Sequence, residues 1–165
     1  MKKLFLLVSL LLFLASCGSS RKASNSVAKG TPTTSVSGKK VNKIISYAKT
    51  FEGTRYKFGG TSSSGMDCSG LVYTAFKKEE IALPRVSRDM AKRGKRISLA
   101  QVAKGDLVFF QTNKNKNVIN HVGLVVEAKG TTIKFIHSTS SRGVIISSLD
   151  ERYWKSAFKE VRRVI

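Results

Sequence analysis

Cysteine and histidine are scarce in this chain of 165 residues, which contains only Cys17, Cys68, His121 and His137. Their spacing shows neither a Cys-x-x-Cys nor a His-Glu-x-x-His pattern, the tight arrangements typical of many metal sites. A zinc site made of one cysteine and two histidines is a competing use of these side chains, but without such spacing we expect no metal and no cofactor. With so few cysteines, Cys68 has no disulfide partner if Cys17 is used elsewhere.

Acidic residues are few as well: ten oppose thirty lysines and arginines, which gives a formal net charge of +20. A charge of this sign favours anionic surfaces. No nucleic-acid-binding module is visible, and the start of the chain indicates export. We therefore expect phospholipid headgroups or cell-wall polymers as anionic partners rather than nucleic acid. For most individual lysines, a solvated basic surface is a sufficient explanation.

A run long enough to span a membrane is also missing. The apolar stretch "LFLLVSLLLFL" follows the basic start "MKK" and is short for a span, so residues 1–16 are expected to be a secretory signal peptide. The tetrapeptide "LASC" resembles a bacterial lipobox, which implies cleavage before Cys17 and a lipid on its sulfur. We therefore expect an exported, membrane-anchored lipoprotein, on the periplasmic side of the outer membrane if the cell has one and at the cell surface otherwise. Ordinary cleavage, which leaves Cys17 unmodified, is the alternative.

Residues 17–40 contain no aromatic side chain and are rich in serine, threonine, glycine and lysine. They are expected to form the lipidated N-terminus and a flexible tether. The globular domain is expected over residues 41–165. Its length suits a single compact domain, no internal repeat is evident, and we expect a monomer.

Apolar residues repeat at helical spacing over residues 41–53 and 67–80, which predicts two helices, and a short helix is expected over residues 87–93. Ser98 and Gln101 match a capping box. After residue 106, short runs rich in valine, isoleucine and phenylalanine alternate with turn signals, which predicts strands. These runs are "DLVFFQ", "HVGLVVEA", "TTIKFIHS", "GVIISSL" and "AFKEVRRVI". Helices first and strands after predict an α+β fold, with N-terminal helices packed on an antiparallel sheet of five to six strands.

Cys68 lies where the second predicted helix begins, and Asp67 is placed to cap that helix. Unpaired N–H groups and the helix dipole favour a thiolate at such a position, so we expect a lowered pKa and a nucleophile. A histidine would supply the base, and a third polar group would orient it. His121 and His137 lie eight residues before and after Lys129, which is the spacing of cross-strand neighbours in a hairpin. Either histidine alone is better explained as a packed structural residue, whereas the pair favours a site.

Several short motifs occur in a fixed order: "RYKFGG", "GMDCSGLV", "LPRVSRDM", "KGDLVFF" and "NHVGLVV". In this order they resemble the NlpC-type cell-wall endopeptidases, a family of papain-like cysteine peptidases that cut peptidoglycan stem peptides. The resemblance covers about residues 41–160. Asp-Cys-Ser-Gly followed roughly fifty residues later by His-Val-Gly is a specific combination, whereas any one motif alone is weak.

The resemblance implies a role for each of the scarce side chains. Cys68 would be the nucleophile, His121 the base and His137 the residue that orients the base. Tyr56 would point its hydroxyl at the scissile carbonyl and form the oxyanion site together with the backbone N–H of Cys68. The implied partner is the peptidoglycan stem peptide, and the implied reaction is hydrolysis of the bond between the γ-carboxyl of D-glutamate and the diamino acid.

The same resemblance places further polar residues around the substrate. Asp67 and Ser69 would line the cleft, with Asp67 able to pair a free substrate amine. Arg85 and Ser87 would form the opposite wall. Simpler explanations remain open: Asp67 as only a cap, Arg85 as a solvated side chain, Ser87 as a helix cap and Tyr56 as a packed aromatic residue.

Two other functions fit the same residues. A non-catalytic lipoprotein could use this cleft to hold wall peptides, with Cys68 as a small buried residue. An amidase or acyltransferase could use the same papain-like core. The reactivity of the Cys68 thiol tests the first alternative, and the masses of the products test the second.

Overall fold

In the computed structural model of this protein, residues 33–165 are described, with side chains from residue 37 onward. The expected signal peptide, the lipidated Cys17 and most of the expected tether lie outside the described residues. The helices are α1 (Thr33–Lys49), α2 (Cys68–Lys77), α3 (Ser87–Met90) and α4 (Arg152–Ala157), with a 3-10 turn, η1 (Leu99–Gln101). The strands are β1 (Thr61–Ser62), β2 (Gly65–Met66), β3 (Lys95–Ile97), β4 (Leu107–Phe110), β5 (His121–Lys129), β6 (Thr132–Thr139), β7 (Gly143–Ser148) and β8 (Phe158–Arg163).

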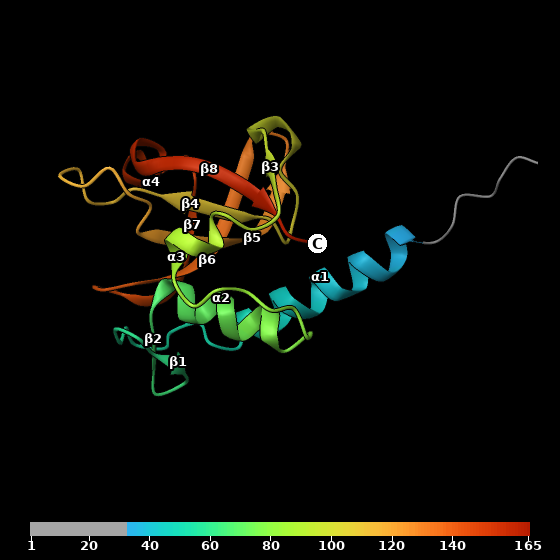
Figure 1. Cartoon of the computed structure of the whole chain (residues 1–165), viewed down its shortest axis with the longest axis horizontal. Coiled ribbons are helices and arrows are strands. Elements are labelled where there is room, and N and C mark those ends of the chain that lie inside the picture. The colour runs from blue at the N-terminus through green and yellow to red at the C-terminus, as the bar shows by residue number, and fades with distance from the viewer. Residues whose placement is uncertain (1–32) are drawn as a thin grey trace, which may run out of the picture. The chain divides into compact units, whose positions relative to one another are not determined.

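Six of these strands form one antiparallel sheet in the order β3-β8-β4-β5-β6-β7 (Figure 1). All five strands predicted from the sequence lie in it, which confirms the α+β class. The sixth strand, β3, pairs with β8 at the edge of the sheet. The sequence does not predict β3, because two of its three residues are basic and the run is too short to show alternation. β1 and β2 form a separate small hairpin before α2.

Side chains alternate between the two faces of the sheet, as the strand pattern predicts. In β4, Leu107 and Phe109 belong to the core cluster that contains α1 and α2. Val108 and Phe110 belong to a second cluster, which contains α4. The sheet is therefore covered on both faces, and in Figure 1 α1 and α2 lie together beneath it.

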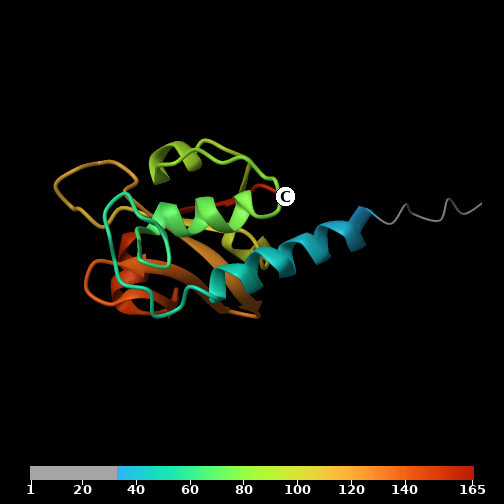
Figure 2. The ribbon, with the colours of Figure 1, turned by 90° about the horizontal axis from the view of Figure 1, so that it is seen from below.

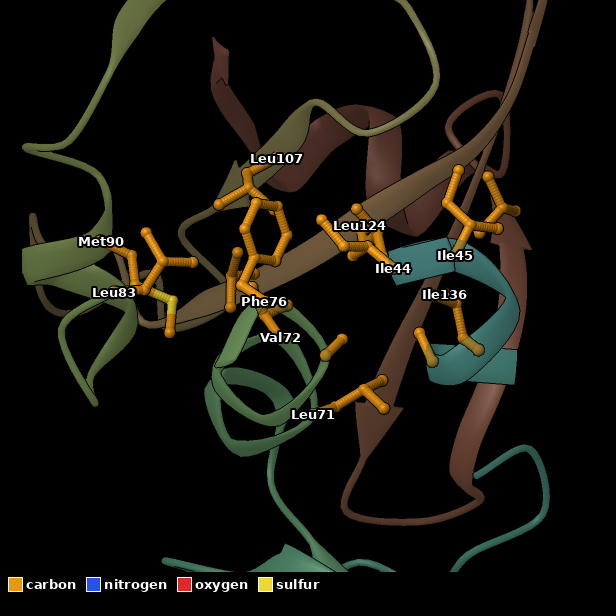
Figure 3. Close-up of a cluster of buried hydrophobic side chains, with 14 of the residues drawn as sticks. Ile44, Ile45, Leu71, Val72, Phe76, Leu83, Met90, Leu107, Leu124 and Ile136 are labelled. Carbon is orange, nitrogen blue, oxygen red and sulfur yellow. The ribbon is translucent and has the colours of Figure 1, made fainter. Parts of the chain in front are cut away.

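The first cluster fixes the position of α2 on the sheet. Figure 3 shows Leu71, Val72 and Phe76 of α2 packed near Leu124 of β5 and Ile44 of α1. All five side chains are fully buried. Since each such side chain contributes about 1.5–3 kcal/mol on burial, the first turn of α2 is held firmly against the strands that follow it.

The start of α1 differs from the sequence prediction. A tether is predicted up to residue 40 and a helix from Val41, whereas α1 begins at Thr33. Residues 37–39 are exposed, and packing begins with Val41 and the buried Ile44. Once the packed part of the helix has formed, each residue added at its end gains a hydrogen bond without a new nucleation cost, so the helix continues past its packed part. Among residues 33–165, no helix is both long and apolar enough to cross a bilayer.

Two predicted features of the connections also differ. The short helix α3 ends at Met90 rather than at residue 93, and the residues after it turn toward Gly94, whose φ is +69°. Ser98 lies at the N-cap of η1, but its hydroxyl bonds the side chain of Gln101 at 3.2 Å and makes no bond to a backbone N–H. The predicted capping box is therefore wrong.

Candidate active site

Asp67 organises the start of α2. It is the N-cap residue, and its Oδ1 accepts the backbone N–H of Gly70 at 2.6 Å, which confirms the predicted cap. Its Oδ2 accepts the backbone N–H of Gly59 at 2.8 Å. A Cβ atom at Gly70 would collide with the backbone oxygen of Gly60, so this loop and the first helical turn are in direct contact. One carboxylate therefore joins the "FGG" loop to the turn that carries Cys68.

Arg85 pairs with the same carboxylate. Its Nη1 donates to Oδ1 of Asp67 at 2.9 Å and its Nη2 donates to Oδ2 at 2.8 Å, a bidentate geometry. Nη1 also donates to the Ser69 hydroxyl at 3.0 Å. The simpler explanation of Arg85 as a solvated side chain is therefore wrong. The two oxygens that were expected to be able to pair a substrate amine already have partners within the protein.

These contacts keep Asp67 ionised. Burial alone would raise its pKa, but hydrogen bonds from Arg85 and from the backbone N–H groups of Gly70 and Gly59 outweigh that effect, so the pKa lies below its usual value of 3.8. The carboxylate is charged at neutral pH and holds Arg85 against the start of α2.

β5 and β6 pair as predicted and bring His121 and His137 together. Leu124 stands opposite Ile136, and continuing this register offsets the two histidines by two residues rather than placing them directly opposite. Side chains with this diagonal offset on one face can still touch. His121 Nε2 and His137 Nδ1 are 2.9 Å apart. The count about Lys129 misses the exact partner because Lys129 pairs with Thr132, so the hairpin is centred after Lys129 rather than on it.

Two contacts place Cys68 beside the histidine pair. Val122 and Ser138 each follow one of the two histidines in sequence. Cys68 packs against the core cluster that contains Val122, whose backbone N–H favours the charged form of the thiol. The hydroxyl of Ser138 donates to the backbone oxygen of Met66 at 2.8 Å, just before the start of α2. The strands that carry the histidines are therefore tied to the helical turn that carries the partly buried thiol.

Burial sets the pKa of each of the three central groups. It raises the pKa of the Cys68 thiol, and the Asp67 carboxylate adds to this effect, although the Val122 N–H opposes it. The lowered thiol pKa expected from the helix position is therefore wrong, because the sequence does not reveal how far the thiol is removed from water. Burial also lowers the pKa of His121 to about 4 and that of His137 to about 2. Both imidazoles are neutral at neutral pH, the form in which His121 can accept a proton.

Trp154 of α4 contacts both imidazole rings. Its indole stacks on His121, with ring centroids 5.0 Å apart and 23° between the planes. It stands nearly perpendicular to His137, at 4.6 Å and 84°. The buried Nε2 of His137 has no hydrogen-bond partner in the described part of the chain. The edge-to-face arrangement of His137 and Trp154 is one in which an imidazole N–H can point at an aromatic face. Trp154 is not among the site residues predicted from the sequence. In the sequence, this residue stands out only as the single tryptophan of the chain.

A cleft of about 730 Å³ opens at the beginning of α2. Its lining includes every residue expected on the substrate side, together with the nucleophile: Tyr56, Asp67, Cys68, Ser69, Arg85 and Ser87. Figure 2 shows the loop before α2 and the loop between β4 and β5 at this end of the helix, and both contribute to the lining. The two histidines are 8 % and 0 % exposed and are not among the lining residues. Within residues 33–165, no three Cys, His, Asp or Glu side chains form a group that could hold a metal ion.

Two residues of the cleft wall can be described further. Burial raises the pKa of Tyr56, and the Asp67 carboxylate and the ionised form of Cys68 raise it further, so the phenol is protonated at neutral pH and can donate a hydrogen bond. Ser87 is buried and begins α3, but the N-cap of that helix is Val86. The simpler explanation of Ser87 as a helix cap is therefore wrong.

Comparisons with known proteins agree with one another. The model of the NlpC/P60 family matches residues 53–163. A probable endopeptidase NlpC homolog from Haemophilus influenzae is 40% identical over 114 residues, which cover 68% of this chain and 57% of that protein. The murein DD-endopeptidase MepS/murein LD-carboxypeptidase of Escherichia coli is 35% identical over 125 residues, which cover 75% of this chain and 63% of that protein.

A Bacillus subtilis gamma-D-glutamyl-L-lysine dipeptidyl-peptidase is 37% identical over 121 residues, which cover 73% of this chain and 40% of that protein. Among solved structures, an NlpC/P60 family protein from Bacillus cereus has a TM-score of 0.68 and 30% sequence identity, covering 75% of this chain and 40% of that chain. The chain spans only part of the length of each of these relatives.

Proposed function

The chain belongs to the NlpC/P60 family, and on that premise we propose that it is a cysteine peptidase that hydrolyses peptidoglycan stem peptides. One observation carries the proposal: Cys68 begins α2 in a cleft and packs against the cluster that contains Val122, the residue after His121, and His121 Nε2 lies 2.9 Å from His137 Nδ1. The names of the relatives support the substrate class, because they describe murein peptidases and a glutamyl-lysine dipeptidyl-peptidase.

In the proposed reaction, His121 takes the proton of the Cys68 thiol, and the sulfur attacks the carbonyl carbon of the scissile amide. The resulting oxyanion accepts hydrogen bonds from the backbone N–H of Cys68 and from the hydroxyl of Tyr56. His121 then gives its proton to the leaving amine, and the C–N bond breaks to leave a thioester. In the second half, His121 removes a proton from the water that hydrolyses this thioester. His137 accepts the Nε2–H of His121, which leaves Nδ1 of His121 unprotonated as the base.

We propose the bond between the γ-carboxyl of D-glutamate and the diamino acid as the target. The name of the B. subtilis relative supports this bond, whereas that of the E. coli relative describes a DD-endopeptidase and an LD-carboxypeptidase. Digestion of defined wall fragments, with mass analysis of the products, distinguishes these reactions and also an amidase or acyltransferase. The proposal predicts fragments that begin at the diamino acid, and fragments cut only at other bonds contradict it.

The full-length chain with Cys68→Ala tests the nucleophile, and Cys17→Ala is its matched control because it removes the other cysteine. We expect Cys68→Ala to release no stem-peptide fragments from purified wall, while circular dichroism shows an intact fold. Cys17→Ala should release them at the wild-type rate. If the wild-type chain binds wall peptides without cutting them, the non-catalytic lipoprotein is the better account.

We also propose that the chain is exported and anchored to a membrane through a lipid on Cys17, which the N-terminal sequence motif supports. Cells fed labelled palmitate should incorporate label into the wild-type chain and into Cys68→Ala but not into Cys17→Ala. Label in Cys17→Ala would contradict the anchor. Because one chain supplies every side chain of the proposed site, we further propose a monomer, and sedimentation of the purified domain as a dimer would contradict it.

A further inference from the structure

A second cavity, which the proposed reaction does not use, adjoins the catalytic cleft. This cavity has a volume of about 510 Å³ and shares Arg88, Val118 and Ile119 with the cleft. The rest of its lining comes from the segment after α3, from β3, from β8 and from the loop between β4 and β5: Lys92, Arg96, Gln111, Asn117, Lys159 and Glu160. We name this cavity the basic groove. Because it shares lining residues with the cleft, it is placed to receive a part of a substrate that extends beyond Cys68.

Four of the nine lining residues of the basic groove are cationic and one is anionic. Two of the cations already have partners: Lys92 pairs with Asp89 at 2.8 Å, and Arg96 pairs with Glu160 at 3.5 Å. Glu160 also accepts from Arg162 at 2.9 Å. The single carboxylate of the groove is therefore bound by two arginines and does not offset its other charges.

The remaining cations, Arg88 and Lys159, are exposed and have no salt-bridge partner in the part of the chain that the structure describes. The side-chain amides of Gln111 and Asn117 lie in the same lining and add neutral donors. The high net charge of the chain does not make every cavity basic. A third cavity of about 370 Å³ has one basic and one acidic residue in its lining. The excess of positive charge is shared by the basic groove and the cleft, whose lining has Arg85, Arg88 and Lys116 against Asp67.

We propose that the basic groove is a subsite for a carboxylate-bearing extension of the wall peptide, which Arg88 and Lys159 hold while the scissile bond lies at Cys68. The proposal rests on the proposed function, because it takes the substrate to be a stem peptide. Such a peptide ends in a carboxylate, and a glutamate linked through its γ-carboxyl keeps a free α-carboxylate. A guanidinium and an ammonium group in a groove with neutral donors match these anions.

The test compares two stem peptides that differ only in a terminal carboxylate or carboxamide. The variants are Arg88→Gln, Lys159→Gln and the double substitution in the full chain. Lys95→Gln is the matched control. Lys95 is exposed and lines neither the cleft nor the basic groove, and its substitution removes the same single charge. We expect the wild-type chain to prefer the carboxylate in kcat/KM. Since exposed ion pairs are weak, each groove substitution should lower the preference for the carboxylate peptide by about two- to fivefold, mainly through a change in KM. The double variant should lose most of this preference.

Ionic strength gives a second measurement of the same contact. Added salt should reduce the preference of the wild-type chain for the carboxylate and should leave the double variant unchanged, since exposed charges are screened. A double variant that keeps the wild-type preference overturns the proposal. Loss of the preference in Lys95→Gln to the same degree also overturns it, because the effect would then belong to the overall charge.

Equilibrium binding separates the groove from the catalytic proposal. In the Cys68→Ala background, the dissociation constants of the two peptides should differ by the same factor, and the groove substitutions should remove the difference. If the wild-type chain cuts neither peptide but this binding preference holds, the proposed reaction fails and the groove stands. The proposal is overturned if both peptides bind equally. It is also overturned if only a phosphate-rich polymer competes for the groove, because the groove then takes another ligand.

Discussion

Replacing Trp154 with alanine is expected to move the acid limb of the pH–rate profile toward neutral pH. The indole stacks on His121 and stands edge-on to His137, so it excludes water from both rings. Burial lowers the pKa of His121 from 6.5 to about 4, which corresponds to about 3 kcal/mol in favour of the neutral ring. Without the indole, water reaches the imidazole and the pKa rises toward 6.5. A larger fraction of His121 is then protonated between about pH 4 and 6.5, and the base is lost in that range.

The assay is kcat/KM on a purified stem peptide across this pH range, because that ratio reports the ionisation of the free enzyme. Trp154→Phe is the matched control: it keeps an aromatic ring against both imidazoles, so its acid limb should stay close to that of the wild type. Trp154→Ala also creates a cavity and should lower the free energy of unfolding by about 3–5 kcal/mol, so it is measured where circular dichroism shows it folded. A folded Trp154→Ala protein with the wild-type acid limb would show that the indole does not lower the pKa of His121.

Three further changes probe other parts of the site. Asp67→Ala leaves Arg85 without its carboxylate and should lower the free energy of unfolding by about 3 kcal/mol in urea melts at pH 7, with less effect as the pH falls through the lowered pKa of Asp67. Gly70→Ala forces a methyl group against the backbone oxygen of Gly60, so overpacking of about 1–3 kcal/mol is expected in the same melts, together with a lower kcat/KM. Burial raises the pKa of the Cys68 thiol, so its alkylation rate should still be rising with pH near the usual thiol pKa of 9.0. The rate is measured in Cys17→Ala, where Cys68 is the remaining cysteine, and a plateau below pH 7 would instead show a preformed thiolate.

The sequence alone predicts those parts of the site whose structure depends on residues close to one another in the chain. The alternation of apolar residues predicts the strands of His121 and His137, and the order of strand, turn and strand predicts that they meet. The position of Asp67 before an apolar helical pattern predicts the cap that the structure shows. Each of these inferences needs only neighbours in sequence or a single hairpin.

The rest depends on contacts between distant segments. Arg85 reaches Asp67 across 18 positions, which include the whole of α2 and the irregular segment after it, so its ion pair leaves no periodic trace in the sequence. Trp154 contacts the histidines from α4, which lies on the face of the sheet opposite α1 and α2, and nothing near it in sequence indicates that contact. The predicted lowering of the Cys68 pKa is wrong for a related reason. The position of a residue in a helix is a local property, whereas its burial is set by the whole fold.

The most direct test of the central claim, that Cys68 is the nucleophile, is to trap the thioester. The full-length chain is mixed with a purified stem peptide, quenched in acid within the first turnover and analysed by intact and peptide mass spectrometry. We expect the acyl part of the substrate to be attached to the peptide that contains Cys68 in the wild type and in Cys17→Ala. Cys68→Ala should carry none and release no product. Product release by Cys68→Ala at the wild-type rate, with no acylated protein in any sample, would contradict this claim.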